Sequence, residues 1–486
     1  MRYLCTFIIL TFNLSVCAAL TPPLENAALQ NSSYSFYAKY VDGDDIISVN
    51  PALRLTPAST VKLFTTAAAL SLLGPETTFK TRLYYDGKKN IFGTLRGNIY
   101  IAGGGDPALG SSRIKNNPDM DAVLSAWADS VKNAGIKKIS GAVYADNSYF
   151  EGLATPRKFA WEDIGNYYGA RADTLNFNDN SFKIYFKPST APDMAADIAR
   201  TVPEVQGLTI KNHILSSSDS ADNAYIFGAP GKMEIEIYGT IPAVNYEFSI
   251  NAALPNPPLF AAQSLVQTLG TRGIKTEEGA KVSDVNIDYS GKTRLYEITS
   301  PSVLEIINVI NKKSFNLYAE VMLKQLAAAF GRRADTESGV DVIMKFLEAH
   351  YIDTNDTVLY DGSGLSRSNI TNAKTIVSLL EIMTKEKNFD LFYNSLLIPE
   401  DGDRKYFARV FARSSALKTA RIKTGTNANA RAYAGYAKDK QGRMIAFCFI
   451  VNNYTVATPA ISAIFDKLVI QMSNLEYAGT ASKKFK

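Results

Sequence analysis

The spacing of hydrophobic and polar residues divides the chain into three stretches. The first begins with two short strands, predicted at residues 33–40 and 46–49, and continues into an apolar helix over residues 60–73 that a Gly-Pro pair ends. From residue 81 to residue 290 the pattern instead favours short strands and turns. The two helices predicted within this second stretch cover residues 119–134 and 258–269.

Helical spacing dominates the third stretch, beyond residue 300. The helices predicted there cover residues 302–311, 315–330, 340–349 and 373–383, and a last helix covers residues 459–472. Strands are predicted before it, at residues 420–425, 432–438 and 443–451. The economical interpretation is one α/β domain built from both ends of the chain, residues 20–80 and 291–478, with a β-rich region inserted at residues 81–290.

The N-terminus has the features of an export signal. Arg2 precedes an apolar run over residues 4–16, and small residues follow at positions 17–19. The run is too short for a bilayer-spanning helix, so no stable membrane insertion is expected. We expect residues 1–19 to be cleaved off and the protein to be periplasmic or otherwise exported. Acylation of Cys17, which would anchor a lipoprotein, is the alternative.

Composition narrows the possible functions. At 486 residues the chain exceeds the size of one hydrophobic core, so two or three domains are expected. The net charge of +5 comes from dispersed basic residues, which argues against a nucleic-acid partner. His213 and His350 are the only histidines, both interpreted as structural, and Cys448 is the only cysteine beyond the signal. No metal or cofactor site is apparent, and hydrolytic chemistry would need a base other than histidine.

Ser59 and Lys62 form a Ser-x-x-Lys string where the first predicted helix begins. Residues i and i+3 share one face of a helix, so these two side chains can meet. The helix N-terminus favours developing negative charge. Burial would lower the lysine pKa and let a neutral amine accept the serine proton. The alternative is a capping serine beside an extended lysine. The same string recurs at residues 112–115 and 415–418, so it identifies no site alone.

A second string, Ser314-Phe315-Asn316, lies at a break between two predicted apolar helices. In a catalytic interpretation Ser314 relays a proton to a leaving amine, and Asn316 binds a substrate amide. A simple helix cap is the alternative.

The third string, Lys423-Thr424-Gly425-Thr426, lies on a predicted strand. Gly425 would let the backbone of an edge strand approach a ligand closely, so that a peptide could pair with it as an added strand. Lys423, Thr424 and Thr426 would hold a terminal carboxylate. The main-chain N–H of Thr426, with that of Ser59, would form an oxyanion hole. The alternative is that Gly425 is an ordinary glycine within a strand and binds no ligand.

In this order the three strings form an acyl-transfer site without histidine. They resemble a known family: the D-alanyl-D-alanine carboxypeptidase/endopeptidases among the low-molecular-mass, class C penicillin-binding proteins, peptidase family S13. The separation of 252 positions between Lys62 and Ser314 is typical of this family, whose inserted region forms two extra domains. Further segments that resemble the family lie at residues 104–107, 141–146, 361–367 and 432–436.

The resemblance implies a fold of the β-lactamase/DD-peptidase type, with an antiparallel sheet flanked by helices. It also implies two nested domains in the insert, about residues 81–105 with 170–290, and about residues 106–169. By resemblance, Asp146 projects from the insert towards the diaminopimelate side chain of a substrate. A turn aspartate that caps the residues after it is the alternative for Asp146.

The implied reaction is attack by Ser59 on the D-Ala-D-Ala peptide of a peptidoglycan stem. An acyl-enzyme forms, water hydrolyses it, and β-lactams acylate the same serine as substrate mimics. A serine β-lactamase or esterase uses the same strings, but the large insert disfavours it. The other alternative is a catalytically silent wall-binding protein. The intact Ser59, Lys62 and Lys423 argue against it, because such a protein has no chemical need for all three. The sequence makes no prediction of oligomeric state.

Overall fold

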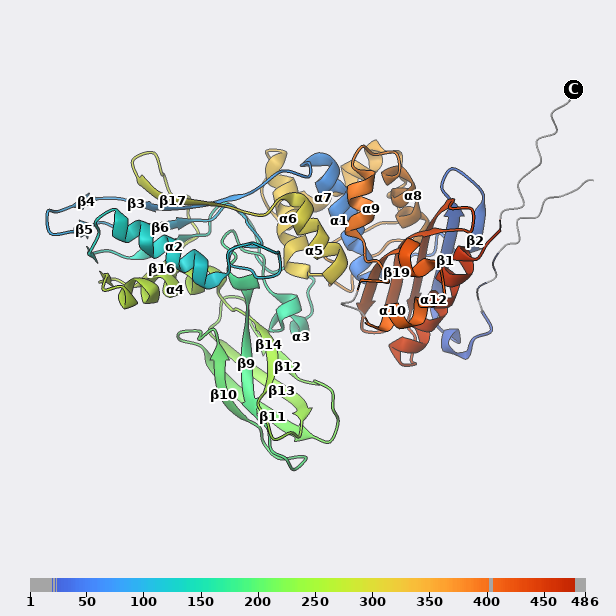
Figure 1. Cartoon of the computed structure of the whole chain (residues 1–486), viewed down its shortest axis with the longest axis horizontal. Helices are drawn as coiled ribbons and strands as arrows, with labels where there is room; N and C mark the ends of the chain where they lie inside the picture. The colour runs from blue at the N-terminus through green and yellow to red at the C-terminus, as the bar shows by residue number, and fades with distance from the viewer. Residues whose placement is uncertain (1–19, 21, 23, 402–404, 477–486) are drawn as a thin grey trace, which may run out of the picture.

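A five-stranded antiparallel sheet stands at one end of an elongated molecule (Figure 1). In the computed structural model, which describes residues 20, 22, 24–401 and 405–476, its strand order is β18-β19-β20-β1-β2. The strands are β1 (Ser33–Tyr40), β2 (Asp45–Val49), β18 (Arg421–Asn427), β19 (Ala430–Lys438) and β20 (Met444–Asn452). Ser33 pairs with Asn452 and Tyr40 with Ile445, so both ends of the chain build one sheet, as the hydrophobic pattern predicts.

Both faces of this sheet are buried, which explains the nearly continuous apolar run of β20. Alternate residues enter two cores, Cys448 and Ile450 on one face and Phe447 and Phe449 on the other. Helices α1 (Lys62–Leu72) and α8 (Ala373–Met383) belong to the first core, and α12 (Thr458–Ser473) with α10 (Lys405–Phe411) belongs to the second. Cys448 is fully buried, as its place in an apolar strand predicts.

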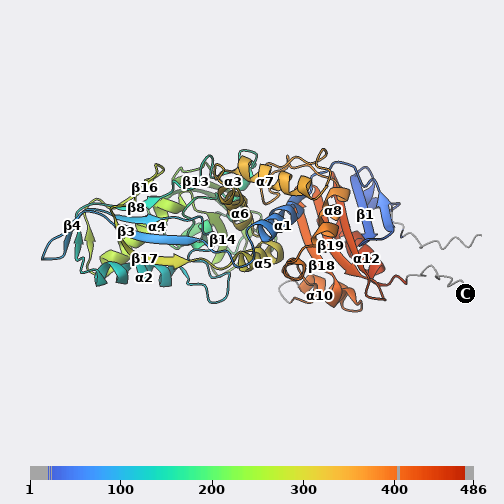
Figure 2. The same cartoon turned by 90° about the horizontal axis from the view of Figure 1, so that it is seen from above.

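A group of helices separates the sheet from the insert in both views (Figures 1 and 2). These are α5 (Val303–Lys313), α6 (Asn316–Ala329) and α7 (Thr336–Ala349), packed around α1. Every residue of α1 from Lys62 to Leu70 is buried, and its alanines allow close approach of the neighbouring helices. Short helices such as α9 (Phe389–Ser395) and α11 (Ala416–Thr419) escape prediction because they contain too few turns to show a period.

The outer part of the insert is a five-stranded sheet of order β16-β8-β6-β3-β17, extended by a smaller sheet of order β15-β7-β5-β4. Helices α2 (Met120–Asn133) and α4 (Pro257–Thr271) pack beside them. The strands of the larger sheet are β3 (Lys80–Tyr85), β6 (Ile99–Ala102), β8 (Val143–Asp146), β16 (Ala280–Ser283) and β17 (Thr293–Thr299). Those of the smaller sheet are β4 (Lys88–Lys89), β5 (Thr94–Arg96), β7 (Lys138–Ile139) and β15 (Lys275–Thr276).

The inner part of the insert is a separate lobe of strands, drawn in green below the rest of the molecule in Figure 1. Two three-stranded sheets, β10-β9-β14 and β11-β13-β12, make up this lobe and bury isoleucine and phenylalanine side chains. Their strands are β9 (Ser181–Lys187), β10 (Asp197–Val202), β11 (Thr209–Ser217), β12 (Tyr225–Gly228), β13 (Glu234–Pro242) and β14 (Phe248–Ala253).

Strand pairing differs from the expected division of the insert at two points. Residues 106–169 do not stand apart, because β8 lies in this interval and pairs with β6 of the outer sheet. Strand β17, beyond residue 290, pairs with β3 and so belongs to the outer sheet as well. Local alternation of hydrophobic residues marks a strand but does not identify its partner, so the sequence does not show these pairings, and the domain boundaries within the insert stay a prediction.

The predicted signal, residues 1–19 with Cys17, lies outside the described residues. Among the helices that the structure does describe, none is long and apolar enough to cross a membrane.

Candidate active site

Ser59 and Lys62 meet just before α1 begins. Ser59 lies in a 3₁₀ turn, η2 (Ala58–Val61), rather than in the first turn of the α-helix that the sequence predicts. The turn places Lys62 Nζ 3.0 Å from Ser59 Oγ. Lys62 is fully buried, whereas Ser59 is partly exposed, so the hydroxyl is open to a substrate and its partner amine is shielded.

Three oxygens surround the buried amine of Lys62. Besides Ser59 Oγ, it donates to Asn316 Oδ1 at 2.7 Å and to the main-chain oxygen of Ser363. Burial lowers the pKa of Lys62 to about 7, although the carboxylates of Asp361 and Glu320 act in the opposite direction. Much of this amine is therefore neutral at neutral pH and able to accept the Ser59 proton.

Glu320 is a buried acid that the sequence analysis missed. It follows Asn316 by one helical turn of α6, so both side chains share a face. Its carboxylate accepts from the main-chain N–H groups of Gly362 at 3.2 Å and Ser363 at 2.8 Å. Burial raises the pKa of Glu320. This carboxylate orients the loop so that the Ser363 oxygen reaches Lys62, and a lone acid inside an apolar helix is the signal that reveals it.

Asp361 organises the same loop from within. Its oxygens accept from the N–H groups of Gly364 at 2.7 Å and Ser366 at 2.6 Å, and burial raises its pKa. Gly364 adopts a φ of +79°, and a Cβ there would lie 2.0 Å from the oxygen of Ala58. Only glycine lets this loop press against the turn that holds Ser59.

Ser314 and Lys423 form the second half of the site. Ser314 caps the C-terminus of α5 in a left-handed conformation, with φ 58° and ψ 35°. For a non-glycine residue this geometry is uncommon and concentrates at functional sites. Lys423 is fully buried, and its Nζ donates to Ser314 Oγ at 2.8 Å and to the oxygen of Thr424 at 2.7 Å. The second hydroxyl of the site thus lies against a second buried lysine.

The insert supports the second string through Phe315. The guanidinium of Arg113 lies over the Phe315 ring, 4.0 Å from its centroid. Tyr318 packs edge-on against the same ring at 4.9 Å, and its hydroxyl donates to Ser111 Oγ at 2.8 Å. Arg113 and Ser111 belong to the insert, so the insert helps to fix the backbone that presents Ser314.

Strand β18 brings the third string against Ser59. A Cβ on Gly425 would lie 2.8 Å from the Pro57 oxygen and 3.0 Å from the Ser59 nitrogen, which explains the glycine. β18 is an edge strand, and Ile422 exchanges main-chain hydrogen bonds with Leu397 on its outer side. Since strand groups alternate with a period of two, the N–H groups of residues 424 and 426 point to that same outer edge.

The segment after this string is tied to its surroundings. Arg431 contacts the Thr426 hydroxyl and approaches the Gly425 oxygen at 3.4 Å. Asn427 donates through its side chain to the oxygen of Gly364 at 3.1 Å. The end of β18 and the loop that orients Lys62 are therefore held together.

The insert also forms one wall of the site. Glu162 of α3 (Trp161–Ile164) forms an ion pair with Arg367, which follows the loop beside Lys62. Asn316 Nδ2 donates to the main-chain oxygen of Tyr168 at 2.7 Å. Asp163 is buried next to these groups, and burial raises its pKa while Arg367 opposes that shift. Sequence analysis did not single out any of these insert residues.

Asp146, the insert residue for which the resemblance implies a substrate contact, is held by neighbours within the insert. It ends strand β8 and is only 6% exposed. One carboxylate oxygen accepts from Tyr289 OH at 2.7 Å, and the other accepts from the Ser148 N–H at 2.9 Å. These are the bonds of a turn aspartate that caps the residues after it, and the contact of Asp146 with a diaminopimelate side chain stays a prediction.

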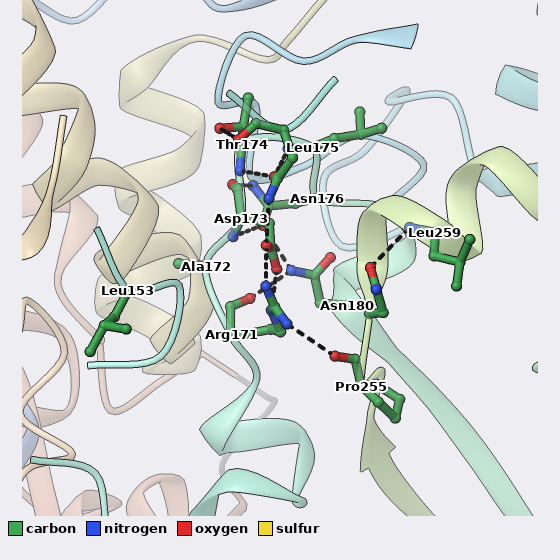
Figure 3. Close-up of polar contacts among 12 residues, drawn as sticks. Leu153, Arg171, Ala172, Asp173, Thr174, Leu175, Asn176, Asn180, Pro255 and Leu259 are labelled. Carbon is green, nitrogen blue, oxygen red and sulfur yellow. Dashed lines mark hydrogen bonds and ion pairs between the residues drawn. The ribbon is translucent and has the colours of Figure 1, made fainter. Parts of the chain in front are cut away.

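A network of polar contacts joins α6 to the insert. Lys324, two helical turns beyond Asn316, donates to the main-chain oxygens of Leu153 and Ala172 at 3.0 Å each. Next to Ala172, Arg171 and Asp173 form an ion pair at 2.7 Å, and Asn180 donates to the Arg171 oxygen at 2.8 Å (Figure 3). One face of α6 therefore touches Lys62 at its start, the loop in the middle and the insert further on.

Together, these features define a serine hydrolase in which a buried lysine activates the nucleophile beside the edge of an antiparallel sheet. The chain belongs to the D-Ala-D-Ala carboxypeptidase 3 (S13) family, whose sequence model matches residues 16–475. It is accordingly a serine-type peptidase of the D-Ala-D-Ala carboxypeptidase class, as the resemblance predicts.

Relatives with that name cover most of the chain. A D-alanyl-D-alanine carboxypeptidase of Actinomadura sp. is 26% identical over 466 residues, which span 94% of this chain and 84% of the relative. The D-alanyl-D-alanine carboxypeptidase DacB of Haemophilus influenzae is 26% identical over 432 residues, 88% of this chain and 86% of the relative.

Solved structures share the fold. The crystal structure of penicillin binding protein 4 (dacB) from Haemophilus influenzae matches with a TM-score of 0.79 at 22% identity, covering 92% of this chain and 97% of that chain. The same protein in complex with a β-lactam matches with a TM-score of 0.74 at 22% identity, covering 92% and 98%. The expected β-lactamase/DD-peptidase fold with added domains is confirmed.

Proposed function

We propose that this peptidase hydrolyses the D-Ala-D-Ala end of peptidoglycan stem peptides, and D-Ala-diaminopimelate cross-links, through an acyl-enzyme on Ser59. The observation that carries the proposal is the contact of Ser59 Oγ with the buried Lys62 amine at 3.0 Å, opposite a second hydroxyl held by Lys423. The first group can make a nucleophile and the second can protonate a leaving amine, which is what amide hydrolysis requires.

In acylation, the substrate pairs with the outer edge of β18. Its scissile carbonyl oxygen lies between the N–H groups of Ser59 and Thr426, which stabilise the developing negative charge. Lys62 takes the proton from Ser59 Oγ as this oxygen bonds to the carbonyl carbon. Lys423, Thr424 and Thr426 hold the terminal carboxylate of the departing D-alanine.

Collapse of the tetrahedral intermediate breaks the C–N bond. Ser314 donates its proton to the leaving nitrogen, so that D-alanine departs as a neutral amine. The proton that Lys62 took from Ser59 then replaces the lost proton of Ser314, which leaves Lys62 neutral for deacylation, and Asn316 positions the substrate amide. Deacylation reverses these roles: water attacks the ester carbon, Lys62 accepts the proton of the water, and Ser59 recovers its own proton as the ester C–O bond breaks. Atoms and protons balance over the cycle.

β-Lactams would acylate the same serine because their strained amide places a carboxylate and a carbonyl where D-Ala-D-Ala places its own. The nitrogen that leaves remains tethered to the acyl group, and this slows the entry of water. The β-lactam complex of the Haemophilus relative supports the proposal. The export signal in the sequence supports action in the periplasm or the cell wall, where the peptide substrate lies.

The test is the intact mass of the mature protein after mixing with benzylpenicillin. We expect one persistent adduct on the native protein and none on Ser59→Ala. Ser415→Ala, which changes the serine of another Ser-x-x-Lys string, should keep the adduct. An adduct that disappears quickly with drug hydrolysis would make the protein a β-lactamase. Absence of any adduct would favour the catalytically silent wall-binding interpretation.

A further inference from the structure

A row of exposed and half-buried aromatic side chains lies on the surface of the inner lobe of the insert. On one face of the sheet β11-β13-β12, His213 and Tyr225 are the cross-strand neighbours of Tyr238 on either side. The His213 and Tyr238 rings stack, with centroids 4.4 Å apart and planes 11° from parallel. Tyr225 is 47% and Tyr238 44% exposed.

The row continues to helix α3 through two further rings. Phe227, on the same face of β12 as Tyr225, lies 6.0 Å from the Tyr238 ring. Trp161 of α3 lies 4.8 Å from Phe227, and its indole N–H donates to the Gly228 oxygen at 3.2 Å. Trp161 is 67% exposed although its position is fixed by these contacts. We call the five residues the aromatic row: Trp161, Phe227, Tyr238, Tyr225 and His213.

Folding alone does not explain the aromatic row. The opposite face of the same sheet already supplies the core of the lobe, with Ile214, Ile226, Ile235 and Ile237 all buried. A strand with one buried face normally carries polar residues on the other face. Large rings left together in water indicate a surface that binds a partner.

The aromatic row begins at the wall of the active site. Trp161 precedes Glu162, which pairs with Arg367 next to the loop that orients Lys62. A ligand lying along the row would therefore reach the wall of the site that Glu162 and Arg367 form. The aromatic row is continuous with the wall of the active site. We therefore expect its ligand to be part of the same polymer as the peptide bound in the site.

The chemistry of the surface fits a sugar chain. Tyr238 OH donates to Glu236 at 3.0 Å, and Lys211 lies 3.1 Å from the same carboxylate, so polar groups flank the rings. Pyranose rings present C–H faces that stack on aromatic rings, and hydroxyl and acetamido groups that bond to such polar neighbours. From these contacts we propose that the aromatic row binds the N-acetylated glycan strand of peptidoglycan while its stem peptide occupies the active site. This inference rests on the proposed function.

The first test is calorimetric titration of the full mature protein with a chitin oligosaccharide, an N-acetylated glycan without peptide. Tyr238→Ala should weaken binding about tenfold or more, since a stacked ring near the centre of the row is lost. Phe92→Ala is the matched control, because Phe92 is 76% exposed on the outer part of the insert, and should bind as the native protein does. Equal binding by native protein and Tyr238→Ala, or no binding by either, would overturn the proposal.

A second measurement separates this proposal from the proposed function. Tyr238→Ala should lower the rate on intact peptidoglycan and leave kcat/KM on a free stem peptide unchanged. Equal loss on both substrates would assign Tyr238 a structural role and contradict the inference. Failure of the native protein to cleave either substrate would refute the proposed function, whereas the calorimetric result would still decide whether the row binds glycan. A thermal melt of each variant confirms that it is folded.

Discussion

The reactivity of this site comes from individual side chains that are removed from water and contact fixed protein groups instead. Lys62 loses all contact with water, and burial lowers its pKa to about 7, while its three oxygen partners keep the amine aimed at Ser59. At Ser314 the cost lies in the backbone: the residue is held in an unfavourable left-handed conformation, and its hydroxyl reaches Lys423. Two buried lysines thus each hold one serine hydroxyl, in one site without histidine.

The pKa of Lys62 predicts the pH dependence of acylation. Below pH 7 the amine is protonated and cannot accept the Ser59 proton, so the second-order rate of penicillin acylation should fall tenfold per pH unit. Above about pH 7 the rate should level off. Stopped-flow measurement of the acylation rate between pH 5 and 9 gives this profile. The range extends about two pH units on each side of the Lys62 pKa.

The chain allows a clean control for this profile, because it has only two histidines. A variant with His213→Asn and His350→Asn lacks every side chain whose ordinary pKa lies near 7. It should keep the same inflection. Loss of the inflection in that variant would assign the pH dependence to histidine and contradict the role given to Lys62.

At the scale of elements, the site depends on how closely a strand edge approaches a turn. β18 passes η2 with no room for a Cβ at Gly425, and the loop at Gly364 presses on η2 from another side. These two glycines set the position of Ser59 relative to the groups that polarise a substrate. Both lie in segments that the sequence analysis quotes, but only the structure shows what each glycine touches.

Gly425→Ala should therefore reduce acylation without unfolding the protein. The new methyl group must displace the Pro57 oxygen or the Ser59 nitrogen, which lie within 3.0 Å of its position. A shift of this kind at the nucleophile is expected to lower the acylation rate about a hundredfold. Penicillin acylation rates and thermal melts of the variant measure the two effects separately.

Gly270→Ala is the matched control for that substitution. Gly270 lies in α4 with nothing within 4 Å of an added Cβ. The change should leave acylation unaltered and stabilise the protein by about 0.5–1 kcal/mol, because alanine loses less conformational freedom in a helix. Native acylation by Gly425→Ala would refute the close-approach argument.

The sequence predicts the positions of helices and strands better than the contacts between segments that are distant along the chain. Strong periods place α2, α5, α6 and α8 within a few residues of the predicted ranges, whereas short helices such as α9 lack a period. The Ser-x-x-Lys string predicts that Ser59 and Lys62 meet, because they are three residues apart, whereas the contacts of Lys62 with Asn316 and of Lys423 with Ser314 join different strings. Glu320, Asp361 and Tyr168 approach Lys62 or Asn316 only through long-range packing, and the nesting of the insert depends on pairings between distant strands.

At the scale of the whole molecule, the insert is part of the active site rather than an appendage. Arg113 holds Phe315, Tyr168 receives a hydrogen bond from Asn316, and Lys324 anchors α6 to the segment around Ala172. These contacts reach the catalytic domain at separate points, from Phe315 just before α6 to Lys324 within it. The insert can therefore set the shape of the substrate groove and, through the aromatic row, the direction in which a polymer enters it.

A double-mutant cycle on Glu162 and Arg367 tests this arrangement. Both side chains are 45% exposed, so their coupling in the free energy of unfolding should be below about 1 kcal/mol. Either Glu162→Gln or Arg367→Gln should nevertheless lower kcat/KM on a stem peptide about tenfold, since the wall is no longer tied to the loop beside Lys62. The double variant should be no worse than either single one.

The matched control is another exposed ion pair of the insert, between Arg200 and Glu247 on the inner lobe. Arg200→Gln should leave the hydrolysis of a stem peptide unchanged. High salt should reproduce part of the loss seen in Glu162→Gln, because it screens the exposed pair. If Glu162→Gln and Arg200→Gln had the same effect on hydrolysis, the wall of the site would not depend on this contact, and the insert would act on catalysis only through its anchoring of α6.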